Sequence, residues 1–204
     1  MLVIGTANLK KGRELADLFM PVGVELSTLA DFPNVIAVPE EGETFAANAV
    51  LKAVGYARQL RRWVLADDSG LLVDALDGQP GVLSARYAGE DATDDDNNRL
   101  LLERLGETPL DKRSARFVCH MALADPQGEI QAESEASCRG RILFEPRGEH
   151  GFGYDPLFEI VEYRRSFAEF GPLVKACLSH RARAARLLIP PLMELVDSGK
   201  MAHT

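Results

Sequence analysis

The N-terminal part of the sequence alternates between short apolar runs and an amphipathic helical pattern, which constrains the fold more than any other feature. Residues 2–4 are apolar, and apolar positions then recur at helical spacing over 15–19, before Pro21. A second strand is predicted over 24–28. A strand, a helix and a second strand in this order are typical of an α/β fold.

The rest of the chain continues this alternation. The patterns predict a long helix over 43–60, strand pieces at 63–66 and 71–73, a helix from Thr93 to Leu105, strands at 115–124 and 129–138, and a last helix over 179–195. The change to a long hairpin after Arg113 suggests a second lobe. We therefore expect an α/β fold with a mixed sheet, flanking helices, two lobes that share a core, and a ligand cleft between them.

Charge and cysteine content exclude several classes of protein. The 204 residues hold 23 Lys and Arg against 31 Asp and Glu, a net charge of −8, which argues against nucleic acid as the main partner. A small anionic ligand remains possible if the protein has a local basic pocket.

Cys119, Cys138 and Cys177 show no CxxC spacing, so we expect neither a disulfide framework nor a zinc site. A reducing, cytoplasmic setting fits best, with no signal peptide and no membrane partner.

The loop from Gly5 to Lys11 joins the first predicted strand to the first helix. Backbone N–H groups at a helix start, the Thr6 hydroxyl, the Asn8 amide and the lysines can together bind a phosphate chain. The alternative is an ordinary loop with an Asn cap and solvated lysines. The segment has neither the Walker A nor the GxGxxG spacing.

Two adjacent carboxylates, Asp67 and Asp68, follow an apolar strand piece. Because consecutive side chains of an extended chain point to opposite sides, at most one should face a ligand while the other makes local hydrogen bonds. A carboxylate beside phosphates requires a divalent cation, so a phosphate ester ligand would imply Mg²⁺. The alternative is an Asx turn that ends the strand.

Three other segments have residue types that suit a ligand but also suit ordinary structure. The acidic stretch 39–45 precedes a helix, where carboxylates usually face the helix dipole. The Gly-rich segment 151–156 places two aromatic residues where a base could stack, or where a hairpin corner could pack. The last helix begins with Ser179, His180 and Arg181. Their side chains could donate hydrogen bonds to a ligand, or Ser179 could be the N-cap and the other two could lie on an exposed first turn.

Together these segments resemble the inosine triphosphate pyrophosphatases, also called non-standard purine NTP pyrophosphatases, over the length of the chain. The residues that carry the resemblance are Thr6-Ala7-Asn8 with Lys11, Glu40-Glu41-Gly42-Glu43-Thr44-Phe45 with Asn48-Ala49 and Lys52-Ala53, Ala66-Asp67-Asp68-Ser69-Gly70-Leu71 with Val73-Asp74, Gly78-Gln79-Pro80-Gly81-Val82 with Ser84-Ala85-Arg86-Tyr87, Phe152-Gly153-Tyr154-Asp155-Pro156, and Ser179-His180-Arg181.

This resemblance implies a hydrolase that converts deaminated purine triphosphates such as ITP, dITP and XTP to the monophosphate and pyrophosphate. It implies Mg²⁺ as cofactor, with one or more ions per active site, and a homodimer. The fold it implies is a single domain over 1–204, with an elongated mixed sheet in two lobes and the active cleft between them.

The resemblance also assigns roles to individual residues. Asp68 matches the general base and metal ligand, and Glu40 matches a second acidic position at the metal. The phosphate-binding loop matches Thr6, Asn8 and Lys11, with Ala7, Leu9 and Lys10 beside them, and Ser69 matches a substrate contact. The nucleobase pocket matches Phe152, Gly153, Tyr154, Asp155, Lys175, His180 and Arg181.

Donors of such a pocket would distinguish the bases, because hypoxanthine and xanthine present an acceptor at O6 where adenine presents an amino group. Arg181, Lys175 or backbone N–H groups would be left unpaired by ATP. Guanine also has O6, and the sequence does not show how its 2-amino group would be rejected.

The sequence departs from the family pattern at three positions. Ala47 stands where Glu is common, so the metal site would depend more on Glu40, Glu41 and Asp68. Ala7 and Lys10 stand where glycine is frequent. Two other functions remain open: a related pyrophosphatase for other modified nucleotides, and a nucleotide-binding sensor without catalysis.

Overall fold

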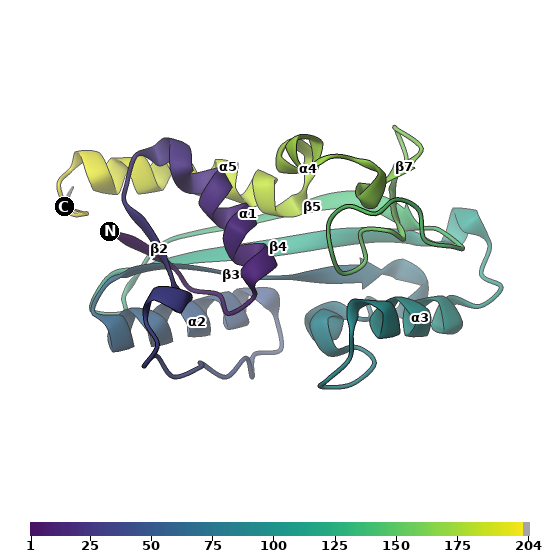
Figure 1. The fold of residues 1–204 in the computed structure, drawn as a ribbon, viewed down its shortest axis with the longest axis horizontal. Coiled ribbons are helices and arrows are strands. Elements are labelled where there is room, and N and C mark those ends of the chain that lie inside the picture. Colours follow the sequence, from purple (N-terminus) through teal and green to yellow (C-terminus); the bar gives the residue numbers. More distant parts are fainter. Residues whose placement is uncertain (202–204) are drawn as a thin grey trace. The chain divides into compact units, whose positions relative to one another are not determined.

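The computed structural model describes residues 1–201 and shows an α/β fold (Figure 1). Its α-helices are α1 (Leu9–Phe19), α2 (Phe45–Leu60), α3 (Asp94–Leu105), α4 (Pro172–Leu178) and α5 (His180–Asp197). Its strands are β1 (Leu2–Ile4), β2 (Leu26–Thr28), β3 (Trp63–Val73), β4 (Ser114–Ala124), β5 (Ile130–Ile142), β6 (Phe158–Ile160) and β7 (Arg165–Ser166).

The strands form one mixed sheet in the order β2-β1-β3-β4-β5-β6-β7. β1 pairs in parallel with β2 and with β3, whereas β6 pairs antiparallel with β5 and with β7. The parallel pairs follow from the helices that connect β1 to β2 and β2 to β3, since a parallel connection requires a crossover. The predicted α/β fold with a mixed sheet and flanking helices is confirmed.

The chain divides into two compact units that alternate along the sequence. Unit 1 comprises 1–68, 119–136 and the described residues from Arg181 onwards, and unit 2 comprises 69–118 and 137–180. β3, β4 and β5 each contribute residues to both units. The prediction that a second lobe begins near Arg113 was therefore wrong. The boundaries between the units fall inside the long strands β3, β4 and β5, and not where the sequence pattern changes to a hairpin. A single domain over 1–204 stays a prediction.

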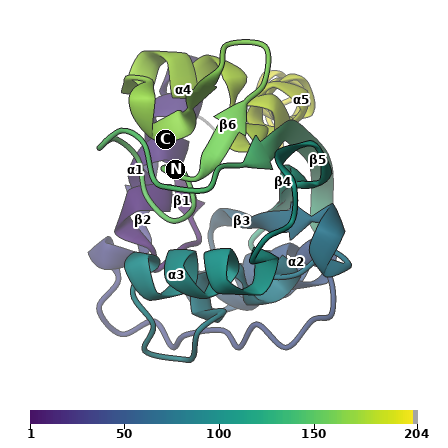
Figure 2. The same cartoon turned by 90° about the vertical axis from the view of Figure 1, so that its right-hand side faces the viewer.

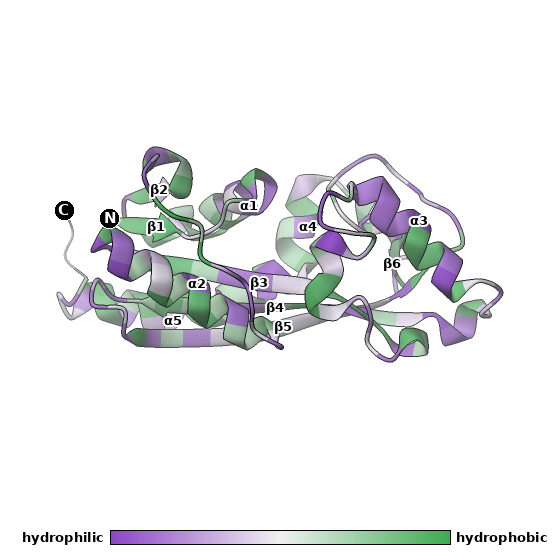
Figure 3. Ribbon diagram, turned by 90° about the horizontal axis from the view of Figure 1, so that it is seen from below, coloured by the Kyte–Doolittle hydropathy of each residue, from purple (hydrophilic) through white to green (hydrophobic). Residues whose placement is uncertain are grey.

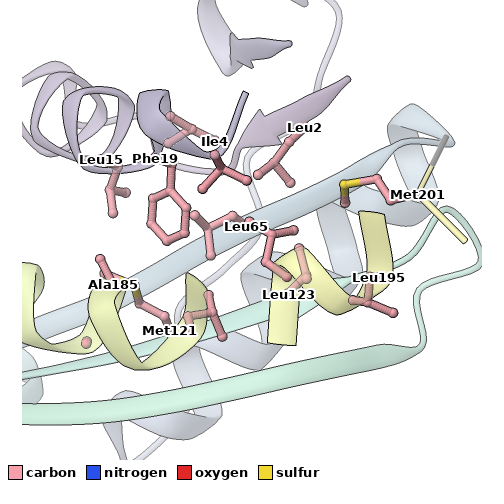
Figure 4. Packing of buried hydrophobic residues seen from close by; sticks show 14 of the residues in the cluster. Leu2, Ile4, Leu15, Phe19, Leu65, Met121, Leu123, Ala185, Leu195 and Met201 are labelled. Atoms are coloured by element: carbon pink, nitrogen blue, oxygen red, sulfur yellow. The ribbon is translucent and has the colours of Figure 1, made fainter. Parts of the chain in front are cut away.

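Unit 1 has two layers of apolar side chains, one on each face of its strands. Leu2 and Ile4 pack with α1 and α5, whereas Val3 packs with α2. Figure 1 shows α1 and α2 on opposite sides of these strands, and Figure 4 shows Leu15 and Phe19 of α1 pointing towards the strand residues. The alternation of strand side chains between two faces produces both layers.

Unit 2 has a core of its own that is rich in aromatic residues. The ring centroid of Phe117 lies 4.6 Å from that of Phe158, and Phe158 stacks on Phe167 at 5.4 Å. Leu101 and Leu105 of α3 belong to the same buried cluster. Figure 2 shows α3 and α4 on opposite sides of the strands of this unit.

The segment from Asp67 to Gly70 does not interrupt the strand. β3 runs from Trp63 to Val73, and both aspartates are buried inside it. Figure 3 shows a hydrophilic stretch within β3. The expected separation into two strand pieces was wrong. Its physical reason is that charged partners on either face compensate the aspartates, as described below, so the backbone can stay extended.

Among the helices of residues 1–201, none is both long enough and apolar enough to cross a membrane.

Candidate active site

The loop after β1 has the geometry of a capped helix start. Asn8 is the N-cap of α1, and its side-chain oxygen accepts hydrogen bonds from the backbone N–H groups of Lys10 at 3.0 Å and Lys11 at 3.1 Å. The Thr6 hydroxyl accepts from the Asn8 N–H at 3.2 Å. The Asn8 side chain therefore shapes the loop, and its amide nitrogen is the part of the side chain that can donate to an anion.

A pocket of about 520 Å³ opens beside this loop in unit 1. Thr6 and Asn8 line it from the end of β1, and Thr28 lines it from the end of β2. Because β1 and β2 are parallel neighbours, their carboxyl ends meet at one edge of the sheet, where α/β proteins commonly bind ligands. Its other lining residues are mainly apolar, and they include Phe32 and Tyr56 but not Glu40, Lys52 or Asp68.

Asp68 lies on the α2 face of β3 in a network of hydrogen bonds. Its two carboxylate oxygens accept from the amide nitrogen of Asn48 at 3.2 Å and from the ammonium of Lys52 at 3.3 Å. The same ammonium donates to Glu40 at 2.9 Å. Lys52 thus bridges Glu40 and Asp68, the two carboxylates that the family resemblance assigns to a metal.

Burial and charge act together on this cluster. Burial raises the pKa of Asp68 above its ordinary value, and the nearby Glu40 and Asp67 raise it further against the opposing effect of Lys52 and Lys11. Burial alone would lower the pKa of Lys52, but the charges of Asp68, Asp67 and Glu40 outweigh it, so the pKa is raised. Lys52 therefore stays protonated and compensates a cluster of carboxylates.

Asp67 lies on the opposite face of β3 and has a different partner. Its carboxylate accepts from Nε of Arg181 at 3.1 Å, and the same guanidinium also pairs with Glu14 of α1. Burial would raise the pKa of Asp67, but Lys11, Arg181 and Lys52 outweigh it and hold the pKa well below its usual range. Asp67 is thus an ionised structural carboxylate, as the alternation of strand side chains predicts.

Asn48 and Lys52 received no individual role from the sequence, although both are buried and contact Asp68. They lie four residues apart on α2, next to the buried Ala49 and Ala53. Two polar residues at buried positions of an Ala-rich helix face are the signal that would have identified them. Asn48 also accepts from the N–H of Gly42 at 2.7 Å.

The donor set around Asp68 fits Mg²⁺ with few protein ligands. Glu40 and Asp68 are hard oxygen donors, and both accept from the Lys52 ammonium, at 2.9 and 3.3 Å. Within residues 1–201 no three His, Cys, Asp or Glu side chains gather as a metal-binding group. Mg²⁺ commonly binds through one or two carboxylates, with water and substrate phosphates as its other ligands.

The residues predicted to bind a base form a second cluster, in unit 2. The Lys175 ammonium donates to Asp155 at 2.7 Å and lies 4.3 Å from the centroid of the Phe152 ring. Asp155 also accepts from the Phe152 N–H at 2.9 Å. Tyr154 is buried and donates its hydroxyl to the Ser84 carbonyl oxygen at 2.9 Å.

Three further predicted residues have different surroundings. The ring of His180 is buried and stacks on Phe117 at 4.7 Å. Ser69 is half-buried in the part of β3 that belongs to unit 2. Arg181 belongs to unit 1 and forms ion pairs there with Asp67 and Glu14. The substrate contact of Ser69 and the roles of His180 and Arg181 at the base stay predictions.

Comparison with known proteins assigns the chain to a family. A model of the Ham1 family matches residues 2–190. The chain belongs to the Ham1 family. It is 52% identical over 197 residues to the dITP/XTP pyrophosphatase of Rhodopirellula baltica, covering 97% of this chain and 95% of that protein. It is 49% identical over 188 residues to the dITP/XTP pyrophosphatase of Bacillus cereus, covering 92% of each.

A solved Ham1 structure confirms the fold independently of these sequence matches. The structure of a HAM1 protein from Coxiella burnetii superposes with a TM-score of 0.86 at 37% identity and covers 95% of this chain and 98% of that one. The resemblance to pyrophosphatases of non-standard purine nucleotides is thereby confirmed at the level of the family.

The buried pair of Arg181 and Asp67 gives a prediction about stability. Replacing Arg181 by Met leaves the Asp67 charge buried without its main partner. We expect Arg181→Met to lower the free energy of unfolding by about 3 kcal/mol. Adding Asp67→Asn should restore part of this loss, because the buried charge is then removed.

Urea unfolding followed by circular dichroism measures both effects. Arg183→Met is the control, since Arg183 is exposed on the same helix and its loss should change the free energy by less than about 0.5 kcal/mol. Equal losses for Arg181→Met and Arg183→Met would show that the buried pair has no special role.

Proposed function

We propose that this protein hydrolyses deaminated purine nucleoside triphosphates, namely dITP, XTP and ITP, to the monophosphate and pyrophosphate. The observation that carries the proposal is the cluster of Glu40, Lys52 and Asp68, which combines two potential metal ligands with a buried cation. Relatives that share about half of its residues over nearly the whole chain are named dITP/XTP pyrophosphatases.

The triphosphate is assigned to unit 1. The Thr6 hydroxyl, the Asn8 amide nitrogen and the Lys11 ammonium supply donors for phosphate oxygens, and Lys10 adds charge beside them. The backbone N–H groups of Lys10 and Lys11 already donate to the Asn8 side chain and shape the loop. Lys11 already interacts electrostatically with Asp67 and Asp68, so it lies within range of the carboxylates. Glu40 and Asp68 would hold Mg²⁺, which supplies charge neutralisation of the phosphates and stabilises the leaving pyrophosphate.

Asp68 is assigned the general base. Asn48 and Lys52 each bind one of its carboxylate oxygens, which fixes the plane of the carboxylate. Each oxygen keeps a further lone pair that can accept the proton of a water molecule. When that water attacks the α-phosphorus, the bond between the α-phosphorus and the oxygen that bridges it to the β-phosphorus breaks, and pyrophosphate leaves. Lys10 and Lys11 stabilise the charge that develops on the phosphate oxygens.

The base is assigned to unit 2, where Phe152 offers a flat surface for stacking. The backbone N–H groups of Phe152 and Gly153 already donate to Asp155 and Asp94, each at 2.9 Å. The Lys175 ammonium also donates to Asp155, but it has three N–H donors, so we assign recognition of O6 to the Lys175 side chain. ATP places an amino group at this position and would leave a donor unpaired, a large penalty in a buried site.

The proposal also includes a homodimer, a cytoplasmic location and Mg²⁺ as the cofactor. Within residues 1–201, Cys119, Cys138 and Cys177 form no disulfide, which fits a reducing compartment. The net charge of −8 supports a small nucleotide rather than nucleic acid as the partner.

Asp68→Asn tests the catalytic assignment. The substitution keeps the shape of the side chain and removes the carboxylate that accepts the proton, so kcat for ITP should fall about 100-fold or more. Pyrophosphate release measures the rate, and circular dichroism checks that the variant is folded.

Asp91→Asn is the matched control, because Asp91 is an exposed aspartate outside the cluster and its loss should leave kcat unchanged. Full turnover by Asp68→Asn at saturating Mg²⁺ would reject Asp68 as the base.

Glu40→Gln tests the metal assignment. Removing one charged ligand should raise the Mg²⁺ concentration needed for half-maximal activity about tenfold, while excess Mg²⁺ restores most of the rate. Glu43→Gln is the control from the same acidic stretch, since Glu43 is exposed. The same Mg²⁺ requirement in both variants would move the second ligand to another residue, with Glu41→Gln as the next variant to measure.

A further inference from the structure

Two side chains of α3 bind both backbone groups of Gly153. The carboxylate of Asp94 accepts from the Gly153 N–H at 2.9 Å, and the amide nitrogen of Asn98 donates to the Gly153 carbonyl oxygen at 2.9 Å. Asp94 and Asn98 lie four residues apart, so they share one face of the helix. All three residues belong to unit 2.

Gly153 needs these bonds to hold its conformation. Its φ angle is +62°, in the left-handed region, and a Cβ added to it would meet no atom within 4 Å. Packing around the residue therefore does not fix its backbone, and glycine has more backbone freedom than any other residue. A turn hydrogen bond from the Asp155 N–H to the Phe152 carbonyl oxygen, 3.3 Å long, closes around Gly153. The two shorter hydrogen bonds from α3 hold the N–H and the carbonyl oxygen of Gly153 directly.

The residues on either side of Gly153 are those assigned to the base. Phe152 precedes it and has the Lys175 ammonium over its ring, and Asp155 binds both Lys175 and the Phe152 N–H. Gly153 joins Phe152 to the residues that lead to Asp155, so its backbone conformation affects where the Phe152 ring lies relative to Lys175. The position of the Phe152 ring, on which the base would stack, thus depends on Asp94 and Asn98.

The burial of Asn98 argues for positioning rather than for stability. Only 7% of Asn98 is exposed, and its side-chain oxygen finds no hydrogen-bond partner among residues 1–201. A buried unpaired acceptor destabilises a fold, and an apolar residue of similar volume would avoid this cost. The neighbouring Asn97, in contrast, uses both ends of its amide, with Ala88 N–H and Ala85 carbonyl oxygen as partners.

We propose that Asp94 and Asn98 are positioning residues that hold Gly153 and so place Phe152 and Lys175 for the purine base. The inference rests on the proposed function for its substrate. In this proposal Asp94 and Asn98 do not touch the base. They determine how well the base site is formed before the nucleotide binds. Such preorganisation acts on binding, because the carboxylates that carry the chemistry lie in the other cluster.

The test combines amide hydrogen exchange without nucleotide and kinetics with ITP. Asp94→Ala and Asn98→Leu should each speed exchange of the Gly153 amide, and raise KM for ITP, about five- to tenfold, with kcat changed less than twofold. Asp94→Asn keeps an acceptor oxygen and should restore both values. Asp95→Ala removes an exposed carboxylate from the same helix turn and should change neither.

The two readouts separate this proposal from the proposed function. Faster exchange with a raised KM supports the positioning role, and an unfolding midpoint of Asn98→Leu close to that of the unsubstituted protein excludes a general loss of structure. Unchanged exchange, or faster exchange with an unchanged KM, overturns it. If the unsubstituted protein releases no pyrophosphate from ITP, dITP or XTP, the proposed function fails and the assignment of a base role to α3 fails with it, while the exchange data still decide whether Asp94 and Asn98 hold Gly153.

Discussion

The alternation of side chains along β3 is the constraint on which the site depends. Asp67 and Asp68 are adjacent and buried, yet they face opposite sides of the strand and meet different cations. Arg181 fixes Asp67 as a structural anion, whereas Lys52 and Asn48 hold Asp68 beside Glu40. Without this separation, two buried carboxylates would repel each other within one environment, and β3 could not continue through them.

The same arrangement explains how an acidic protein can bind an anionic substrate. The net charge of −8 repels phosphate at long range, but Lys11 and Lys52 concentrate positive charge around the two aspartates. Lys52 is buried between carboxylates and needs no rearrangement to remain charged. Such preorganised positive groups stabilise the charge that develops on phosphate oxygens during the reaction, because they do not have to reorient first.

Sequence patterns predicted the regular elements well. The apolar periodicity located β1 and α1, and the helix expected from Thr93 to Leu105 is α3, with Thr93 as its N-cap. The continuity of β3 was missed, because partners such as Arg181 lie more than 100 residues away and only tertiary structure reveals them. Lys52 and Asn98 were missed for a related reason. A polar residue on a buried helix face can be recognised from its spacing, but its partner, Asp68 or Gly153, is brought to it only by tertiary structure. Local patterns thus predict elements, and long-range ion pairs determine which polar residues are functional.

Pyrophosphate release from ITP, dITP, XTP, GTP, ATP and dTTP at equal concentrations, with and without Mg²⁺, tests the central claim most directly. Our account predicts Mg²⁺-dependent release that is strong for the three deaminated purines and weak for the other nucleotides. Strong release from ATP or dTTP would keep the phosphate chemistry and contradict the base assignment. No release from any of the six would contradict catalysis itself and leave a nucleotide-binding protein.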